Sequence, residues 1–200
     1  MKTILSLFDH SGGWSRPYAE AGYDVIMFDI KNGQDIKQFS CEYLFEEWGI
    51  GLVHGILAAP PCTDFAASGA RWWKQKEGTG TVELSIELVY QVLRTVELFE
   101  PEWWAIENPV GRIAKLVPEL NDYPPFWWNP CDYGDPYTKK TGLWGRFTPP
   151  TPLFLGSDWS VEPTEGSKMH CLYGGKSERT KELRSVTPPG FAQAFFKCNP

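Results

Sequence analysis

Runs of apolar residues alternate with helical patterns along the first three quarters of the chain. Continuous apolar runs predict buried strands at residues 3–8, 23–29, 52–58 and 103–106. A short helix is predicted at residues 15–21, and a longer one begins near Thr81 and ends before Pro101. The apolar residues of the longer helix recur at helical spacing and are expected to face the core: Leu84, Leu88, Val92, Val96 and Phe99. This alternation predicts an α/β fold with a mostly parallel sheet and helices on both faces.

The remaining patterns are weaker. They predict helices at residues 41–48 and 113–116, short strands at 127–133 and 142–147, and a helix after Pro189. From Thr148 onward the chain is rich in Pro, Gly and Ser. With 42% hydrophobic residues among 200, we expect one compact domain, residues 1–147, and a small irregular C-terminal extension, residues 148–200, packed on it.

Composition limits the partners and the compartment. A net charge of −6 argues against a molecule coated in positive charge, so nucleic acid would need a local group of Lys and Arg side chains. No apolar run approaches the length of a membrane span, and no export signal precedes the first strand. The five cysteines are scattered without a paired Cys-x-x-Cys spacing, which favours reduced thiols in a cytoplasm over disulfides or a metal site.

Each polar motif of interest directly follows a predicted strand. Residues 9–13, Asp-His-Ser-Gly-Gly, follow the first strand, and Asp29 ends the second. Cys62 follows the third strand, and Glu107 ends the fourth. In parallel sheets, ligands bind beyond the carboxyl ends of the strands. We therefore expect these residues to meet at one edge of the sheet.

The first two motifs favour an adenosine-type cofactor. The glycines of Ser11-Gly12-Gly13 let the backbone approach a ligand at a strand-to-helix turn. Asp29 stands where a carboxylate accepts hydrogen bonds from both ribose hydroxyls, and Asp35 is a candidate acceptor for an adenine amino group. A structural interpretation stays open as well, because Gly-Gly is often only a turn and Asp29 can cap a helix.

Cys62 and Glu107 are the candidates for chemistry. Pro60-Pro61 fixes the backbone before Cys62, so the thiol can be presented rigidly to a cleft. Glu107 ends a very apolar strand, where the charged form of a carboxyl group is disfavoured and a proton can be given to a ring nitrogen. The alternatives are a buried structural cysteine and a glutamate bonded to backbone amides. Asn108 is expected to hold the Cys62 loop through amide hydrogen bonds.

Arg71-Trp72-Trp73-Lys74 combines charge and aromatic rings shortly after Cys62. One interpretation is a mobile loop that closes over a nucleic-acid strand. The other places the tryptophans on the core and the charges in water. The ten tryptophans of the chain fit either an aromatic core or stacking platforms for bases.

Taken in order, the motifs resemble those of DNA (cytosine-5) methyltransferases. The resemblance rests on Leu7-Phe8 with Gly12-Gly13, Asp29, Gly33-Gln34-Asp35-Ile36, Pro60-Pro61-Cys62-Thr63, Glu107-Asn108-Pro109 and Asp132-Tyr133-Gly134-Asp135-Pro136. Arg184-Ser185-Val186-Thr187-Pro188-Pro189 resembles a late motif of the family, and Ser68-Gly69-Ala70-Arg71-Trp72 is similar to its short phage-type members. The resemblance covers residues 4–145 and 184–196.

The resemblance implies a Rossmann-like methyltransferase fold that uses S-adenosylmethionine and acts on cytosine-containing DNA. Cys62 would add to C6 of an extruded cytosine while Glu107 assists at N3, so that C5 accepts the methyl group. The implied catalytic residues are Cys62, Glu107, Asn108 and Lys139. The implied cofactor-binding residues are Phe8, Ser11, Gly12, Gly13, Asp29, Ile30, Asp35, Ile36 and Pro60. The implied nucleic-acid-binding residues are Ser68, Arg71, Lys74 and Lys140, and no metal ligand is implied.

Further expectations concern partners and substrate. Residues 142–183 occupy the place of the family's target-recognition domain and are few, which leaves room for a partner subunit that supplies target recognition. The cytoplasm of a bacterium or of a phage-infected host is the expected location, without a membrane. Two alternatives stay open: the same chemistry on RNA or a cytosine nucleotide, and a catalytically silent nucleic-acid-binding partner subunit. Intact Cys62 and Glu107 favour an enzyme.

Overall fold

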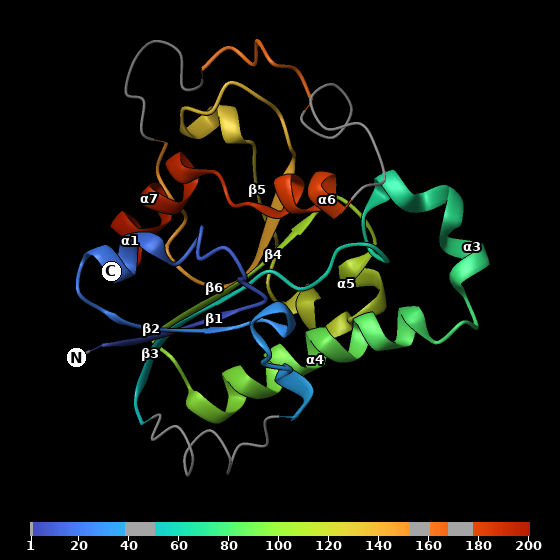
Figure 1. Ribbon diagram of the computed structural model, residues 1–200, viewed down its shortest axis with the longest axis horizontal. Coiled ribbons are helices and arrows are strands. Elements are labelled where there is room, and N and C mark those ends of the chain that lie inside the picture. Colours follow the sequence, from blue (N-terminus) through green and yellow to red (C-terminus); the bar gives the residue numbers. More distant parts are fainter. Residues whose placement is uncertain (1, 39–50, 153–160, 168–177) are drawn as a thin grey trace.

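Within the described residues, a six-stranded sheet forms the centre of the protein in the computed structural model (Figure 1). The structure describes residues 2–38, 51–152, 161–167 and 178–200. The strands are β1 (Thr3–Leu7), β2 (Asp24–Phe28), β3 (Val53–Ala58), β4 (Trp103–Pro109), β5 (Phe126–Trp128) and β6 (Thr141–Arg146), in the spatial order β2-β1-β3-β4-β6-β5. Neighbours among β1 to β4 are parallel, and β6 is antiparallel to β4 and β5. The predicted, mostly parallel sheet is confirmed.

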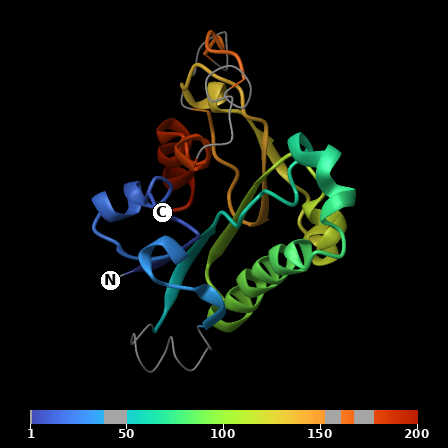
Figure 2. The same ribbon diagram turned by 45° about the vertical axis from the view of Figure 1, so that its right-hand side comes forward.

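Helices cover both faces of this sheet, as predicted. They are α1 (Arg16–Glu20), α3 (Trp73–Lys76), α4 (Thr81–Phe99), α5 (Ile113–Leu116), α6 (Glu178–Ser185) and α7 (Pro189–Cys198). Short 3-10 helices are η1 (Ile30–Asn32), η2 (Ile36–Gln38), η3 (Ala67–Trp72), η4 (Pro118–Asp122) and η5 (Pro130–Tyr133). Figure 2 shows α1 and α7 on one side of the sheet and α4 and α5 on the other.

The core divides into two clusters because successive strand residues point to opposite faces of a sheet. Leu5 of β1 belongs to the cluster that includes Val89 and Val92 of α4. Its neighbour Ile4 belongs to the other cluster, with Phe191 and Phe195 of α7. The C-terminal helix therefore completes one of the two cores, although it lies far along the chain from β1.

The long helix has the predicted bounds but only part of the predicted face. Val92 and Phe99 are buried as expected, and Leu88 and Val96 pack against the core while partly exposed. Leu84, however, is 46% exposed, so its assignment to the core was wrong. The buried side of the helix runs through Val82, Val89 and Val92, a second apolar stripe that spacing alone could not separate from the first.

The structure corrects one further strand prediction, and one predicted helix lies outside the residues that the structure describes. The strand predicted at residues 127–133 is limited to Phe126–Trp128, since Pro130 and a capping box between Asn129 and Asp132 turn the chain into η5. Helix α6 was not predicted, because its sequence is mostly polar. The helix predicted at residues 41–48 lies outside the described residues. The domain boundary at residue 147 stays a prediction.

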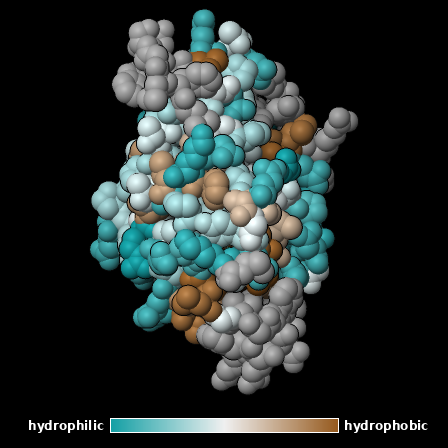
Figure 3. All heavy atoms as spheres, turned by 90° about the vertical axis from the view of Figure 1, so that its left-hand side faces the viewer, coloured by the Kyte–Doolittle hydropathy of each residue, from teal (hydrophilic) through white to brown (hydrophobic). Residues whose placement is uncertain are grey.

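Polar and neutral residues cover most of the described surface in Figure 3, with hydrophobic residues in small separate patches. Among the helices that the structure describes, none combines the length and the apolar character required to cross a membrane.

Candidate active site

The polar residues that follow the strands converge at the carboxyl edge of the sheet. Cys62 comes four residues after the end of β3 and Glu107 lies within β4, the strand paired with β3. Lys139 precedes β6, which pairs with β4 on the other side. The sheet topology thus brings three predicted catalytic residues together from positions far apart in the sequence.

A carboxylate and an ammonium group face each other in this site. Lys139 Nζ lies 3.7 Å from Glu107 Oε1, and the two side chains are only 10% and 16% exposed. The sequence around Glu107 shows only an apolar strand. The structure adds a cation, contributed by the neighbouring strand connection, that the strand sequence could not reveal.

The thiol of Cys62 lies within the electrostatic reach of this pair. Burial raises the pKa of Cys62, the positive charge of Lys139 opposes that rise, and the negative charge of Glu107 adds to it. Arg184, just inside the end of α6, also lowers the pKa of this thiol. Cys62 as a residue is partly exposed, while burial of its thiol is the largest influence on the pKa.

Asn108 holds the loop that carries the thiol. Its side chain is fully buried, and Nδ2 donates a hydrogen bond of 3.2 Å to the carbonyl oxygen of Pro60. On the other side of the thiol, the Cys62 carbonyl accepts hydrogen bonds from the amides of Phe65 and Ala66 at 3.0 and 2.8 Å. The backbone on both sides of Cys62 is therefore fixed, as the sequence predicted for Asn108.

The turn after β1 contains two residues in the left-handed backbone conformation. Phe8 adopts φ of 61°, a left-handed conformation that is uncommon for a residue with a side chain, and Gly12 adopts φ of 65°. A Cβ atom at Gly12 would lie 3.2 Å from Met27 Sδ, and one at Gly13 would lie 3.2 Å from Ser11 Oγ and 3.5 Å from the Thr187 amide nitrogen. The turn therefore packs closely against Met27 and the Thr187 backbone.

Asp9 organises this turn and was missed as a site residue. It is 9% exposed and accepts hydrogen bonds from the hydroxyls of Ser6 at 2.8 Å, Ser15 at 2.9 Å and Ser11 at 3.4 Å. The signal in the sequence was a carboxylate surrounded by three serines within ten residues. Ser11, a predicted cofactor residue, also accepts from the Gly13 amide at 3.2 Å.

The residues predicted after β2 divide into two groups. Asp29 caps η1, with Oδ1 accepting from the Lys31 amide at 2.8 Å, and Asp35 likewise accepts from the Lys37 amide at 3.0 Å. Ile30 is 72% exposed and free to contact a ligand, whereas Ile36 is 7% exposed and packs in the core. The helix-cap interpretation of Asp29 is confirmed, and its cofactor role stays a prediction.

The aromatic loop after Cys62 is anchored rather than detached. Trp73 lies under the Arg112 guanidinium at 4.4 Å, and Lys76 pairs with buried Asp64 at 2.7 Å. The predicted nucleic-acid residues Ser68, Arg71 and Lys74 are exposed, as is Lys140. The structure therefore supports the anchored interpretation for Trp73, while the loop still presents its polar residues to solvent.

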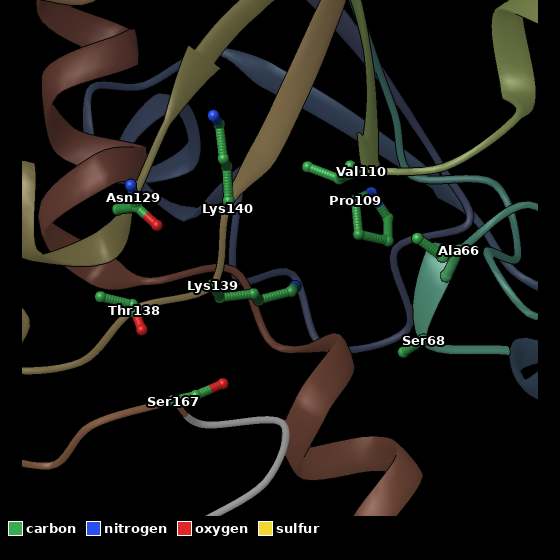
Figure 4. A pocket seen from close by; sticks show the side chains of 10 residues that line it. Ala66, Ser68, Pro109, Val110, Asn129, Thr138, Lys139, Lys140 and Ser167 are labelled. Carbon is green, nitrogen blue, oxygen red and sulfur yellow. The ribbon is translucent and has the colours of Figure 1, made fainter. Parts of the chain in front are cut away.

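A pocket of about 300 Å³ lies next to Lys139 (Figure 4). The start of η3 and the end of β4 form one side, with Ser68 and Val110. Residues 138–140 and Asn129 form the other side, and Ser167 closes it. The Thr138 backbone forms an isolated bridge with Ser167, which ties the C-terminal extension to this pocket.

No group of three or more His, Cys, Asp or Glu side chains arranged to hold a metal ion occurs in the ranges that the structure describes. His170 and Cys171 lie outside those ranges.

Comparisons with known proteins point to methyltransferases. No family model matches the chain. The chain is 23% identical over 167 residues to the type II methyltransferase M.DdeI of Desulfomicrobium norvegicum, covering 68% of this chain but only 38% of that protein. It therefore spans well under half the length of this curated relative.

Solved structures that share the fold include two methyltransferases. One is a putative DNA modification methyltransferase encoded within a prophage of E. coli, with a TM-score of 0.58, 16% identity and coverage of 100% of this chain and 70% of that chain. The other is the Entamoeba histolytica methyltransferase EhMeth, with a TM-score of 0.50, 16% identity and coverage of 88% and 61%. The expected Rossmann-like methyltransferase fold is confirmed.

Proposed function

We propose that this protein is a DNA methyltransferase that transfers a methyl group from S-adenosylmethionine to C5 of cytosine through a covalent bond between Cys62 and C6. One observation carries the proposal: Glu107 and Lys139, 3.7 Å apart, lie close enough to the thiol of Cys62 to act on its charge, in a methyltransferase fold. The likenesses to M.DdeI and to the prophage DNA modification methyltransferase support DNA as the substrate.

The proposed reaction begins when the Cys62 thiolate bonds to C6 of the cytosine ring. The electron pair of the C5–C6 double bond moves into the ring toward N3, where Glu107, in its protonated form for this step, donates a proton or a hydrogen bond. A proton given to N3 returns to Glu107 when C5 bonds to the methyl carbon. C5 then bonds to the methyl carbon, and the electrons of the broken carbon–sulfur bond stay on the donor's sulfur. Loss of the C5 proton to a base and departure of the thiolate restore the C5–C6 double bond.

Lys139 serves two of these steps. Its ammonium group opposes the effect of burial on the Cys62 pKa and thereby favours the thiolate that attacks C6. Its position 3.7 Å from Glu107 Oε1 also keeps that carboxyl group directed into the site. Asn108 acts as a positioning residue, because it touches the backbone of Pro60 rather than the reacting atoms.

The glycine turn after β1 is the proposed cradle for S-adenosylmethionine. Gly12 lacks the side chain that would approach Met27, and Phe8, Ser11 and Gly13 surround the same turn. Asp29, Ile30, Asp35 and Pro60 complete the proposed cofactor side of the cleft, and when bound the cofactor supplies an electrophilic methyl group. Ile36 supports this side from the core.

The test is methyl transfer from labelled S-adenosylmethionine to DNA, RNA and dCMP in parallel, with the wild-type chain and Cys62→Ser. Label incorporated into DNA alone, and lost in Cys62→Ser, is the expected result. Cys198→Ser is the matched control, because Cys198 is also partly exposed but lies at the end of α7 and serves no proposed step.

The other outcomes separate the alternatives. Label in RNA or dCMP but not in DNA contradicts the assignment of DNA as the substrate. The proposed covalent mechanism would then apply to the other substrate. Label in DNA that persists in Cys62→Ser contradicts the covalent route. DNA binding without any transfer favours a silent binding subunit. A partner that supplies target recognition and the cytoplasmic location both stay predictions.

A further inference from the structure

The pocket beside Lys139 is distinct from the place of the target ring. Lys139 lines the pocket and also pairs with Glu107, whereas neither Cys62 nor Glu107 is among the residues that line it. An occupant of the pocket would therefore be one side chain away from the reacting cytosine. A volume near 300 Å³ is at the lower end of the range of ligand pockets.

The walls of the pocket suit a nucleotide. Ala66, Ala67, Pro109 and Val110 supply apolar surface. Polar groups surround that surface, from Ser68, Asn129, Thr138 and Ser167. Lys139 and Lys140 add two cations, and none of the ten described residues that line the pocket is acidic. In a chain of net charge −6, such a wall is a local site for an anion.

An exposed aromatic ring lies next to the pocket. Trp127 is 41% exposed, and the Lys140 ammonium group lies 5.8 Å from the centre of its ring. Trp144 packs against Trp127 edge to face at 5.7 Å, which fixes the ring in place. Bases stack on such rings while lysines contact the phosphates, which is how proteins hold unpaired strands.

We infer that this pocket binds the nucleotide adjacent to the target cytosine, with its phosphate on Lys140 and its base against the apolar wall and Trp127. The inference rests on the proposed function for the identity of the neighbouring site. It makes the substrate a polynucleotide rather than a free cytosine nucleotide, because a mononucleotide would leave this second pocket unused. Ser167 gives the C-terminal extension a direct part in holding the strand.

The test is the affinity of the full chain for a labelled single-stranded oligodeoxynucleotide with one cytosine, measured by fluorescence anisotropy at several salt concentrations without the methyl donor. Lys140→Ala is expected to raise Kd about tenfold and to reduce the slope of log Kd against log salt by about 0.7, the value for one phosphate contact on a single strand. Ala67→Leu, which fills the pocket, is expected to raise Kd roughly tenfold without changing the slope.

Two controls match these variants. Ala70→Leu places the same side chain on η3 outside the pocket lining, and Lys197→Ala removes an exposed lysine near the end of α7. Both are expected to leave Kd within about twofold of wild type. Circular dichroism checks that all four variants fold.

The outcomes distinguish this inference from the proposed function. Equal affinity in the wild type and both pocket variants overturns the pocket assignment, even if the chain methylates DNA. Absence of oligonucleotide binding by the wild type overturns it as well. Weaker binding in both pocket variants of a chain that transfers no methyl group supports the pocket and contradicts the proposed reaction.

Discussion

Glu107 and Lys139 form a partly buried ion pair that links β4 to the residues just before β6, with 3.7 Å between Oε1 and Nζ. The two charges act on the Cys62 thiol in opposite directions, since Lys139 lowers its pKa and Glu107 raises it. Burial is the largest influence on this pKa, and the pair adjusts how much thiolate is present at a given pH. This relationship gives a prediction in which two substitutions move one observable in opposite directions.

Lys139→Met is expected to shift the pH midpoint of Cys62 alkylation upward, because it removes the cation that opposes the effect of burial. Glu107→Gln is expected to shift the same midpoint downward, because it removes a negative charge. Rates of iodoacetamide modification at Cys62, followed by peptide mass spectrometry from pH 6 to 11, measure both. Shifts of the same sign in the two variants would contradict the opposite effects of Lys139 and Glu107 on Cys62. Lys197→Met is the control, because it removes a positive charge far from the site.

Asn108→Ala is expected to destabilise the protein by about 1–3 kcal/mol, because it leaves the buried Pro60 carbonyl without its donor. It should also lower kcat while changing the KM for DNA little, because it loosens the backbone that presents Cys62. Urea unfolding and steady-state kinetics measure the two effects. Asn121→Ala is the control, because Asn121 also donates to backbone carbonyls but from an exposed position. Equal losses in both variants would contradict a special role for Asn108.

Gly12→Ala tests the cofactor cradle. Gly12 and Gly22 both have positive φ, 65° and 85°, so alanine at either is expected to cost about 1–2 kcal/mol of stability. Only at Gly12 would the new Cβ meet another group, Met27 Sδ at 3.2 Å, whereas Gly22 has open space around it. Because Gly12 lies in the proposed cofactor turn and Gly22 does not, Gly12→Ala should weaken S-adenosylmethionine binding in calorimetry while Gly22→Ala does not. Unchanged affinity in Gly12→Ala would place the cofactor elsewhere.

The environment of Asp64 is expected to make the stability of the folded protein depend on pH. Burial alone would raise its pKa, but hydrogen bonds from Lys76 and Ser85 outweigh burial and lower the pKa below its ordinary value of 3.8. A lowered folded pKa stabilises the protein at pH values above 3.8, and this contribution is lost as the pH falls through the folded value. Asp64→Asn should thus be less stable than wild type at pH 7, by about 1–3 kcal/mol, with a gap that shrinks below pH 3.8.

Urea unfolding at pH 7 and at steps below 3.8 measures that gap. Glu77→Gln is the control, since Glu77 is 62% exposed in its pair with Arg112 and should change stability by less than about 0.5 kcal/mol. A gap that stays constant with pH would show that the Asp64 charge contributes nothing.

The sequence predicted the parts of the fold that depend on local pattern. Continuous apolar runs identified β1 to β4, and Pro101 marked the end of α4 close to Phe99. The buried face of α4 was only partly predicted, because the choice between Leu84 and Val82 depends on how the helix is rotated against the sheet. Helix α6 was missed, since its sequence is mostly polar and has no regular apolar stripe.

In the candidate site, too, the sequence predicted what depends on local pattern and missed what depends on contacts between distant segments. Cys62 and Glu107 were found because each follows a strand, and parallel strands place their carboxyl ends together. The contribution of Arg184 to the Cys62 environment was not predicted, because it depends on how α6 packs across the sheet edge. The Asp9 network and the pocket beside Lys139 were also missed, since both are defined by several segments at once.

The covalent bond between Cys62 and the cytosine ring is tested most directly by trapping it. In DNA with 5-fluorocytosine at the target position, methyl transfer to C5 leaves fluorine where a proton must depart, so the adduct should accumulate. Mass spectrometry after incubation with S-adenosylmethionine should find one oligonucleotide attached at Cys62, and none in Cys62→Ser. A wild-type protein that methylates normal DNA yet never forms this adduct would contradict the account.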